Sequence, residues 1–161
     1  MNFEDRLERA IQRGQHSRAT KDREEAAKKL TDDELRSLYS TARLELSERV
    51  EECLKKLADH FPGFHYESLM GESGWGAKVT RDDLNFSAGI TSRSLYSRLE
   101  MVVTPFGSKP IVELVAKGAI RNRELFHRRH YQQLEQLDLS TFCDMVDQWV
   151  VEYAEEFAAA E

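Results

Sequence analysis

The sequence predicts an α+β fold, with an N-terminal helical pair, an antiparallel sheet of four to five strands, and a C-terminal amphipathic helix packed on one sheet face. Three observations predict this fold. Residues 95–120 alternate apolar and polar side chains, as paired strands with one buried face do. Residues 31–61 and 139–157 instead place apolar side chains every three or four positions, which is typical of amphipathic helices. The apolar sheet face needs a cover, and these helices can supply it.

The alternating stretch forms a hairpin around a turn-rich connector, residues 105–110. Its apolar sets are Leu95, Leu99, Met101 and Val103 in the first run and Val112, Leu114, Ala116 and Ile120 in the second. We expect Met101 to lie opposite Leu114 and Leu99 opposite Ala116. A slip of one residue would turn one apolar set to the wrong face.

Length and composition describe one globular domain with its own core. The chain has 161 residues, of which 40% are hydrophobic and 32% charged. The first ten residues, MNFEDRLERA, are charged and lack the apolar centre of a signal peptide. No apolar run approaches the roughly 20 residues that span a bilayer. We therefore expect a cytoplasmic protein without a membrane segment.

Cys53 and Cys143 are far apart in the sequence and belong to no ligand-spaced motif. We interpret them as reduced, buried, small hydrophobic residues. A structural disulfide or a reactive thiol is the alternative.

Residues 1–30 are predicted to form a charged helical arm, and residues 31–161 a single α+β domain. The arm begins with a short apolar stripe formed by Phe3, Leu7, Ala10 and Ile11, followed by a polar stretch that contains Gly14. A helix that is polar all round is exposed and supported by charge pairs, or it frays.

The second helix is predicted to begin at Thr31, which can form a capping box with Glu34. Pro62-Gly63 ends it. Its apolar face contains Leu35, Leu38, Tyr39, Ala42, Leu46, Val50, Cys53, Leu54, Leu57 and Phe61. The spacing is nearly heptad, so the helix either lies across the sheet or forms a seam with a helical partner.

Further strands are predicted on both sides of the hairpin. Residues 64–70 form one strand and a short strand follows through Val79, with the glycines between them making a turn or bulge rather than a phosphate loop. Residues 81–94 are a long loop or a ragged strand at 84–88. The last strand, residues 123–130, follows a tight turn at 121–122, and we expect Leu125 and His127 to face the core.

The final helix is predicted to be capped by Asp138 or Ser140. Its apolar stripe contains Phe142, Met145, Val146, Trp149, Val150, Tyr153 and Phe157. We expect Trp149 to be buried against the hairpin, near Met101 and Leu114.

The net charge of −6 is unevenly distributed. Residues 132–161 carry eight acidic residues and no Lys or Arg, whereas residues 95–131 carry seven Lys or Arg and three acidic residues. We interpret this as solvated surface and pairing between the sheet and the final helix. The alternative is a pair of complementary patches for self-association or for an anionic partner.

No motif points to catalysis, a metal or a cofactor. His127 and His130 are three residues apart on a strand, so they face opposite sides and cannot share a metal. Glu100 and Glu113, with Arg98 and Lys117, are expected to form a solvated charge ladder. A carboxylate pair for acid–base chemistry is the alternative.

A basic stretch near the last strand also contains two aromatic residues, Phe126 and Tyr131. The basic stretch consists of Lys117, Arg121, Arg123, Arg128, Arg129 and His130. We interpret these charges as protection of an unpaired sheet edge. Stacking and phosphate contacts with a single-stranded nucleic acid are the alternative.

The leading hypothesis is a non-catalytic protein-binding, adaptor or chaperone-like module, with self-association as a homodimer. The alternatives are an anion or single-stranded nucleic-acid binder that uses residues 117–131, and an enzyme with its site on the polar sheet face. The candidate binding residues are Arg98, Glu100, Glu113, Lys117, Arg121, Arg123, Arg128, Arg129 and His130.

Overall fold

The computed structural model describes residues 2–85 and 93–160, with side chains for all of these except 26–31, 84, 85 and 93. The chain divides into two compact units, Met1–Ser37 and Leu38–Glu161. The elements are α1 (Phe3–His60), β1 (His65–Gly71), β2 (Gly74–Asn85), β3 (Arg93–Val103), β4 (Ile111–Ile120), β5 (Arg123–Gln133), the short 3₁₀ helix η2 (Leu134–Gln136) and α2 (Leu139–Ala160). The predicted α+β class is confirmed.

The first unit is helical, and the side chains of residues 2–25 are all exposed. The helical backbone continues through Thr31, so the predicted helix start at this residue is wrong. Residues 24–30, EEAAKKL, are all good helix formers and favour a helix that continues into residue 31. The expected helical pair is thus two parts of α1, residues 3–37 and 38–60, one in each unit. The start of a folded domain at residue 31 stays a prediction.

The second unit contains a five-stranded antiparallel meander in the order β1-β2-β3-β4-β5. Arg121 and Asn122 have φ values of 48° and 68° and form the predicted two-residue turn between β4 and β5. Strand β5 lies at one edge of the sheet, as predicted for residues 121–130. Strand β2 runs in regular pairing to Asn85, beyond the predicted loop start at residue 81, and residues 93–94 of the predicted loop belong to β3. Residues 86–92 of that loop lie outside the described residues.

The predicted register of the central hairpin is wrong by two residues. Met101 lies opposite Ala116, and Val103 lies opposite Leu114. Because side chains alternate with a period of two, this shift leaves each apolar set on its predicted face. Leu99, Met101, Val103, Leu114 and Ala116 are all fully buried. Alternation alone cannot distinguish registers that differ by two.

A β-bulge between Gly118 and Ala119 changes which side chains of β5 face the core. Gly118 lies opposite Phe126 and Ala119 lies opposite Glu124, so Leu125 is the extra residue. Phe126 is buried, Leu125 is half-buried and His127 is exposed. The prediction that Leu125 and His127 face the core is therefore wrong.

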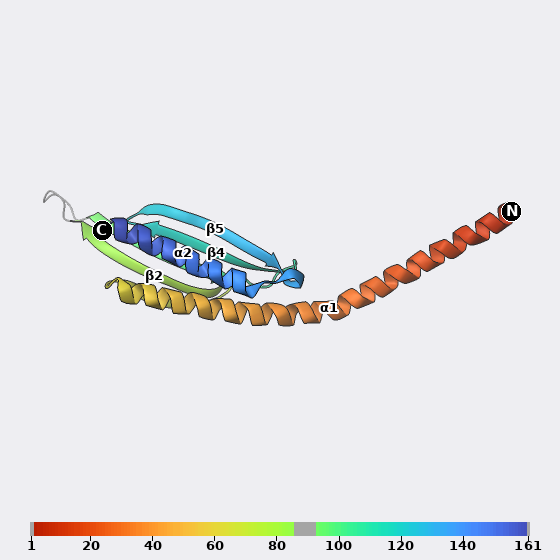
Figure 1. Ribbon diagram of the computed structural model, residues 1–161, viewed down its shortest axis with the longest axis horizontal. Helices are drawn as coiled ribbons and strands as arrows, with labels where there is room; N and C mark the ends of the chain where they lie inside the picture. Colours follow the sequence, from red (N-terminus) through yellow and green to blue (C-terminus); the bar gives the residue numbers. More distant parts are fainter. Residues whose placement is uncertain (1, 86–92, 161) are drawn as a thin grey trace. The chain divides into compact units, whose positions relative to one another are not determined.

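The second part of α1 and α2 lie over the same face of the sheet (Figure 1). They run in the same direction, since Arg49 pairs with Asp147 and Phe61 contacts Phe157 further along both helices. The buried apolar residues are Leu35, Tyr39, Ala42, Leu46, Val50, Leu54 and Leu57 on α1 and Phe142, Val146, Val150, Tyr153 and Phe157 on α2. The predicted stripes are confirmed at these positions, whereas Leu38 is exposed and Cys53 and Phe61 are half-buried.

Helix α2 begins as predicted, because the Thr141 amide donates to Asp138 Oδ1 over 3.2 Å. Hydrogen bonds from Thr141 lower the pKa of Asp138. The placement of Trp149 in the core is wrong: this side chain is half-buried, on the flank of the stripe. The guanidinium of Arg128 lies 5.9 Å from its ring centre. Steps of four, four, three and four residues from Phe142 to Phe157 bury Val146 and Val150 instead.

Candidate functional site

The sheet face that is opposite the helices carries a row of alternating charges. The register aligns Glu67, Lys78, Glu100, Lys117 and His127 across the five strands. Lys78 pairs with Glu67 at 3.5 Å. Lys78 and Glu100 each lie between two opposite charges, and Lys117 lies between Glu100 and His127, which supports the predicted solvated ladder.

Five of the candidate binding residues lie on this open face: Arg98, Glu100, Glu113, Lys117 and Arg129. Arg98 pairs with Glu100 at 2.7 Å, and Glu113 lies 3.8 Å from Arg129. Lys117 faces Glu100 on the neighbouring strand. The two carboxylates are thus each engaged with a guanidinium, and the register places them on different rows of the sheet.

The basic residues of β5 are divided between the two faces. Arg128 lies on the helix side, where it donates to both carboxylate oxygens of Glu152, at 2.5 and 2.8 Å, and stacks 4.6 Å from the ring centre of Phe126. This hydrogen bonding raises the pKa of Arg128 and lowers that of Glu152. Arg129 points to the open face. The predicted pairing between the basic strand and the acidic final helix is therefore present at Arg128.

Three other candidate residues lie apart from these pairs. His130 packs edge-on against Phe142, with ring centres 4.9 Å apart, and its buried Nε2 has no hydrogen-bond partner among the described residues. The Arg121 amide donates to Ser97 at the β4–β5 turn. Arg123 is exposed at the start of β5. The structure does not gather the predicted basic residues into one site.

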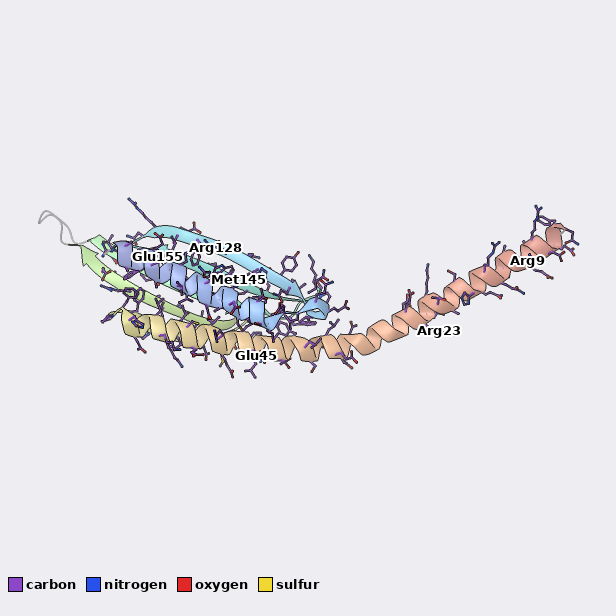
Figure 2. All side chains as sticks on the ribbon, viewed as in Figure 1. Arg9, Arg23, Glu45, Arg128, Met145 and Glu155 are labelled. Atoms are coloured by element: carbon purple, nitrogen blue, oxygen red, sulfur yellow. The ribbon has the colours of Figure 1, made fainter. Side chains whose placement is uncertain are left out.

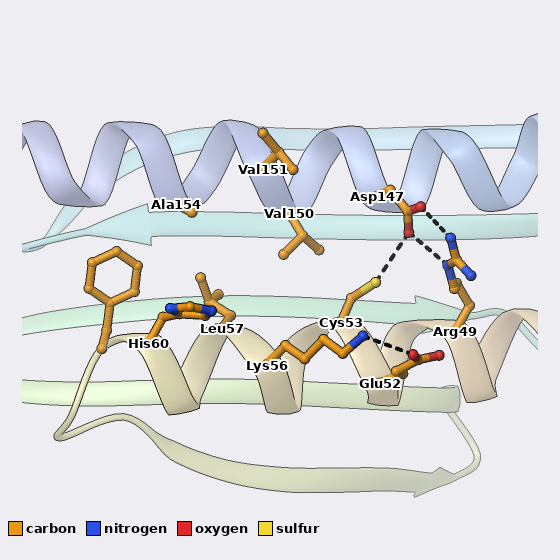
Figure 3. Close-up of a pocket in the computed structure, with 11 residues that line it drawn as sticks. Arg49, Glu52, Cys53, Lys56, Leu57, His60, Asp147, Val150, Val151 and Ala154 are labelled. Atoms are coloured by element: carbon orange, nitrogen blue, oxygen red, sulfur yellow. Dashed lines mark hydrogen bonds and ion pairs between the residues drawn. The ribbon is translucent and has the colours of Figure 1, made fainter.

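A concave site lies instead between α1 and α2 in the second unit. This α1–α2 groove has a volume of about 640 Å³. Figure 3 shows the side chains that line it. They are Arg49, Glu52, Cys53, Lys56, Leu57, His60, Phe61, Asp147, Val150, Val151 and Ala154. Small-molecule and peptide sites are commonly concave and mainly apolar, with a few polar groups.

An ion pair closes one end of the groove. Arg49 Nε donates to Asp147 Oδ1 over 2.7 Å, and its Nη2 donates to Oδ2. The Cys53 thiol donates to Asp147 Oδ1 over 3.2 Å (Figure 3). The hydrogen bonds from Arg49 lower the pKa of Asp147. Asp147 therefore stays ionised at neutral pH and fixes α2 to α1.

Cys53 is a hydrogen-bond donor rather than a nucleophile. Burial, followed by the hydrogen bond to Asp147, raises the pKa of its thiol to about 12. Nucleophilic attack requires the thiolate, which this pKa makes scarce at neutral pH. Both cysteines are free, as predicted, but each is half-buried rather than buried.

The base of the groove is apolar, whereas its α1 wall also carries Glu52, Lys56 and His60. Leu57 and Val150 are buried at its base, Phe61 and Ala154 are half-buried, and the side chain of Val151 is 58% exposed. Lys56 and Glu52 pair at 3.0 Å on the α1 wall. A valine this exposed beside a concave apolar surface is available to a partner.

The sequence contained one signal for this site. Val151 follows the buried stripe residue Val150 and so falls off the stripe, where an apolar side chain has no core to enter. The Arg49–Asp147 pair joins residues that are 98 positions apart. A local sequence pattern cannot predict a contact between residues so far apart in the chain.

The chain matches no protein-family model, no curated protein and no solved structure. Among the described residues, no helix is both long and apolar enough to cross a membrane. In the same part of the chain, no three His, Cys, Asp or Glu side chains gather as a metal site. The geometry of the groove is therefore the basis for a functional proposal.

Proposed function

We propose that this protein is a non-catalytic protein-binding module, and that its α1–α2 groove takes up an amphipathic helix of a partner. The observation that carries the proposal is the apolar groove of about 640 Å³ with the half-exposed Val151 at its edge. Two helices that leave an apolar groove between them are a common receptor for a third helix.

The dimensions of the groove suit a short helical segment. It extends from Arg49 on α1 to Phe61, one residue beyond the end of this helix, which at 1.5 Å per residue is about 18 Å. About three helical turns cover this length and present anchors at positions i, i+3 or i+4, and i+7. Leu57, Val150 and Val151 are placed to receive such anchors.

The polar groups of the groove favour binding over catalysis. Arg49 and Asp147 satisfy each other, Lys56 pairs with Glu52, and Cys53 retains its proton. A general base or nucleophile is instead held close to a group that it activates.

The structure offers less support for the predicted nucleic-acid site than for the groove. Binding of a single-stranded nucleic acid by residues 117–131 would have to use Arg129, His127 and Lys117 on the open face, without Arg128, which is engaged with Glu152. The free cysteines agree with the reducing environment of the cytoplasm, the compartment that we propose.

Photo-crosslinking in the producing cells tests the proposal. The photoreactive amino acid benzoylphenylalanine replaces Val151 at the groove in one chain and Met70, which is 80% exposed on β1, in the control chain. We expect discrete protein adducts from position 151 and few from position 70. Equal adducts from both positions, or none from position 151, would contradict the proposal.

A further inference from the structure

The first unit carries a row of basic side chains along one face of α1, here called the basic stripe. Its members are Arg6, Arg9, Arg13, His16 and Arg23. At 100° per residue, their spacing keeps all five within an arc of about 100° around the helix. All five side chains are exposed, and Arg9 and Arg23 are labelled in Figure 2. The stripe follows the helix over residues 6–23, which at 1.5 Å per residue is about 26 Å.

The basic stripe presents one sign of charge only. Residues 6–23 contain six Lys or Arg and two acidic residues, so this segment has a net charge of +4 in a chain whose total is −6. The two acidic residues, Glu8 and Asp22, fall about 110° and 150° away from the centre of the stripe. A local positive field on an acidic protein points to an anionic partner at this face.

The cations of the basic stripe are not used within the protein. Among the side chains that the structure describes, none of the five forms an ion pair. In the second unit, by contrast, Arg49 and Arg128 each donate to both oxygens of a carboxylate. The first part of the stripe also borders a surface hollow of about 660 Å³, which is lined by Arg6, Arg9, Gln12, Arg13 and His16. The guanidinium groups in this row are therefore available to a series of anions.

Duplex DNA is the polyanion that matches this geometry. It offers a phosphate about every 3.4 Å along each strand, and arginine binds phosphate oxygens in pairs. The major groove of B-form DNA, about 12 Å wide, admits an α-helix, whereas that of an RNA duplex is deep and narrow. An anionic lipid surface would have to contact apolar and basic residues together. Leu7 and Ile11, however, lie about 150° and 170° from the centre of the stripe.

We infer that the first unit binds the phosphate backbone of double-stranded DNA through the basic stripe. The inference goes beyond the proposed function and does not depend on it, because the stripe and the α1–α2 groove belong to different units. Contacts to phosphates carry no sequence information, so binding has little sequence preference. The four arginines of the stripe displace counterions from four phosphates, which makes the affinity fall steeply as salt is added.

Fluorescence anisotropy of a labelled duplex, titrated with the full chain, tests the inference with two matched variants. The duplex has a random sequence of about 24 base pairs, or roughly two helical turns. The stripe variant combines Arg9→Gln with Arg13→Gln. The control variant combines Arg18→Gln with Lys21→Gln, which removes the same charge from the same segment about 170° and 110° away from the stripe. At about 50 mM salt we expect the Kd to rise about tenfold or more for the stripe variant and less than about threefold for the control.

The salt dependence of the Kd separates direct phosphate contacts from a general effect of charge. Each phosphate contact contributes about 0.9 to the slope of log affinity against log salt. We therefore expect a slope of about −3.6 for the wild type and the control variant, and about −1.8 for the stripe variant, which lacks two of the four arginines. Circular dichroism of each variant checks that the helix is intact, which glutamine, a good helix former, favours.

Several results would overturn the inference. The wild type would fail to bind the duplex at about 10 µM protein and low salt, or the two variants would lose affinity equally. A loss in Lys117→Gln with Arg129→Gln, but not in the stripe variant, would assign DNA to the sheet instead. Equal or tighter binding to single-stranded DNA, to an RNA duplex or to phosphatidylserine vesicles would contradict the choice of duplex DNA. None of these results involves the groove, so crosslinks from position 151 test the proposed function separately.

Discussion

Gly76 lies at a point of β2 where a side chain has no room. A Cβ at this position would be 1.9 Å from the carbonyl oxygen of Met101 on β3, whereas a Cβ at Gly71 has no heavy atom within 4 Å. The obstructing atom belongs to the backbone of a central strand, so relief would require the two strands to separate.

We therefore expect Gly76→Ala to lower the free energy of unfolding by about 3 kcal/mol or more, and Gly71→Ala to change it by less than about 0.5 kcal/mol. Urea unfolding of both variants measures the difference. Similar small losses in the two variants would show that β2 and β3 do not approach as described.

Asp147 makes the stability of the protein depend on pH in a defined direction. Its pKa is lowered in the folded state, so its stabilising contribution is present above the ordinary aspartate pKa and is lost as the pH falls through the lower, folded value. The Arg49 and Asp147 side chains are 40% and 36% exposed, which limits the contribution through solvent screening.

We expect Asp147→Asn to cost about 1 kcal/mol at pH 7, and the difference from the wild type to shrink below about pH 4. Unfolding midpoints between pH 2 and pH 8 measure this, with Glu155→Gln, an exposed residue of α2, as the control. If Asp147→Asn lost the same free energy of unfolding at every pH, Asp147 would stabilise the fold through its packing rather than through its charge.

Single residues were predicted well where a local rule determines them. Asp138 caps α2 through an amide three residues away, and Arg121-Asn122 forms a turn of two residues. The positions of Leu125 and Trp149 were predicted wrongly, because the first depends on a bulge and the second on which neighbouring residues fill the core.

At the scale of elements, α2 presents a buried stripe with Trp149 at its flank. Phe142 is fully buried, whereas Trp149 is half-buried beside Arg128. We expect Phe142→Ala to cost about 3–5 kcal/mol and Trp149→Ala about 1–2 kcal/mol. Urea unfolding measures the free energy of unfolding of both variants. A larger loss of this free energy for Trp149→Ala than for Phe142→Ala would mean that Trp149, not Phe142, belongs to the buried stripe.

The types of the elements followed from periodicity, but their limits and pairing did not. Alternation identified the face of each strand in the central hairpin, yet the register differed by two residues, which alternation cannot detect. The capping pattern at Thr31 stands inside a continuous helix, because a run of good helix formers precedes it. Periodicity therefore predicted the layers of the fold better than their boundaries.

At the scale of the whole molecule, the candidate site forms where two helices from opposite ends of the second unit meet. Arg49 belongs to α1 and Asp147 to α2, with the entire sheet between them in the sequence. The sequence predicted where charged residues cluster along the chain and where the N-terminal helix carries its apolar stripe. The groove, in contrast, depends on the common direction and the spacing of α1 and α2. Such long-range geometry has no signature in a local pattern.

The most direct test of the claim that the α1–α2 groove binds an amphipathic helix uses a synthetic amphipathic peptide of about three helical turns, with a scrambled peptide of the same composition as its control. The peptide is titrated into the full chain while methyl signals of Leu, Val and Ala are followed by NMR. We predict saturable shifts at Leu57, Val150, Val151 and Ala154. Shifts at Val102 and Val115 on the open face of the sheet, or no shift at any of these residues, would contradict the claim.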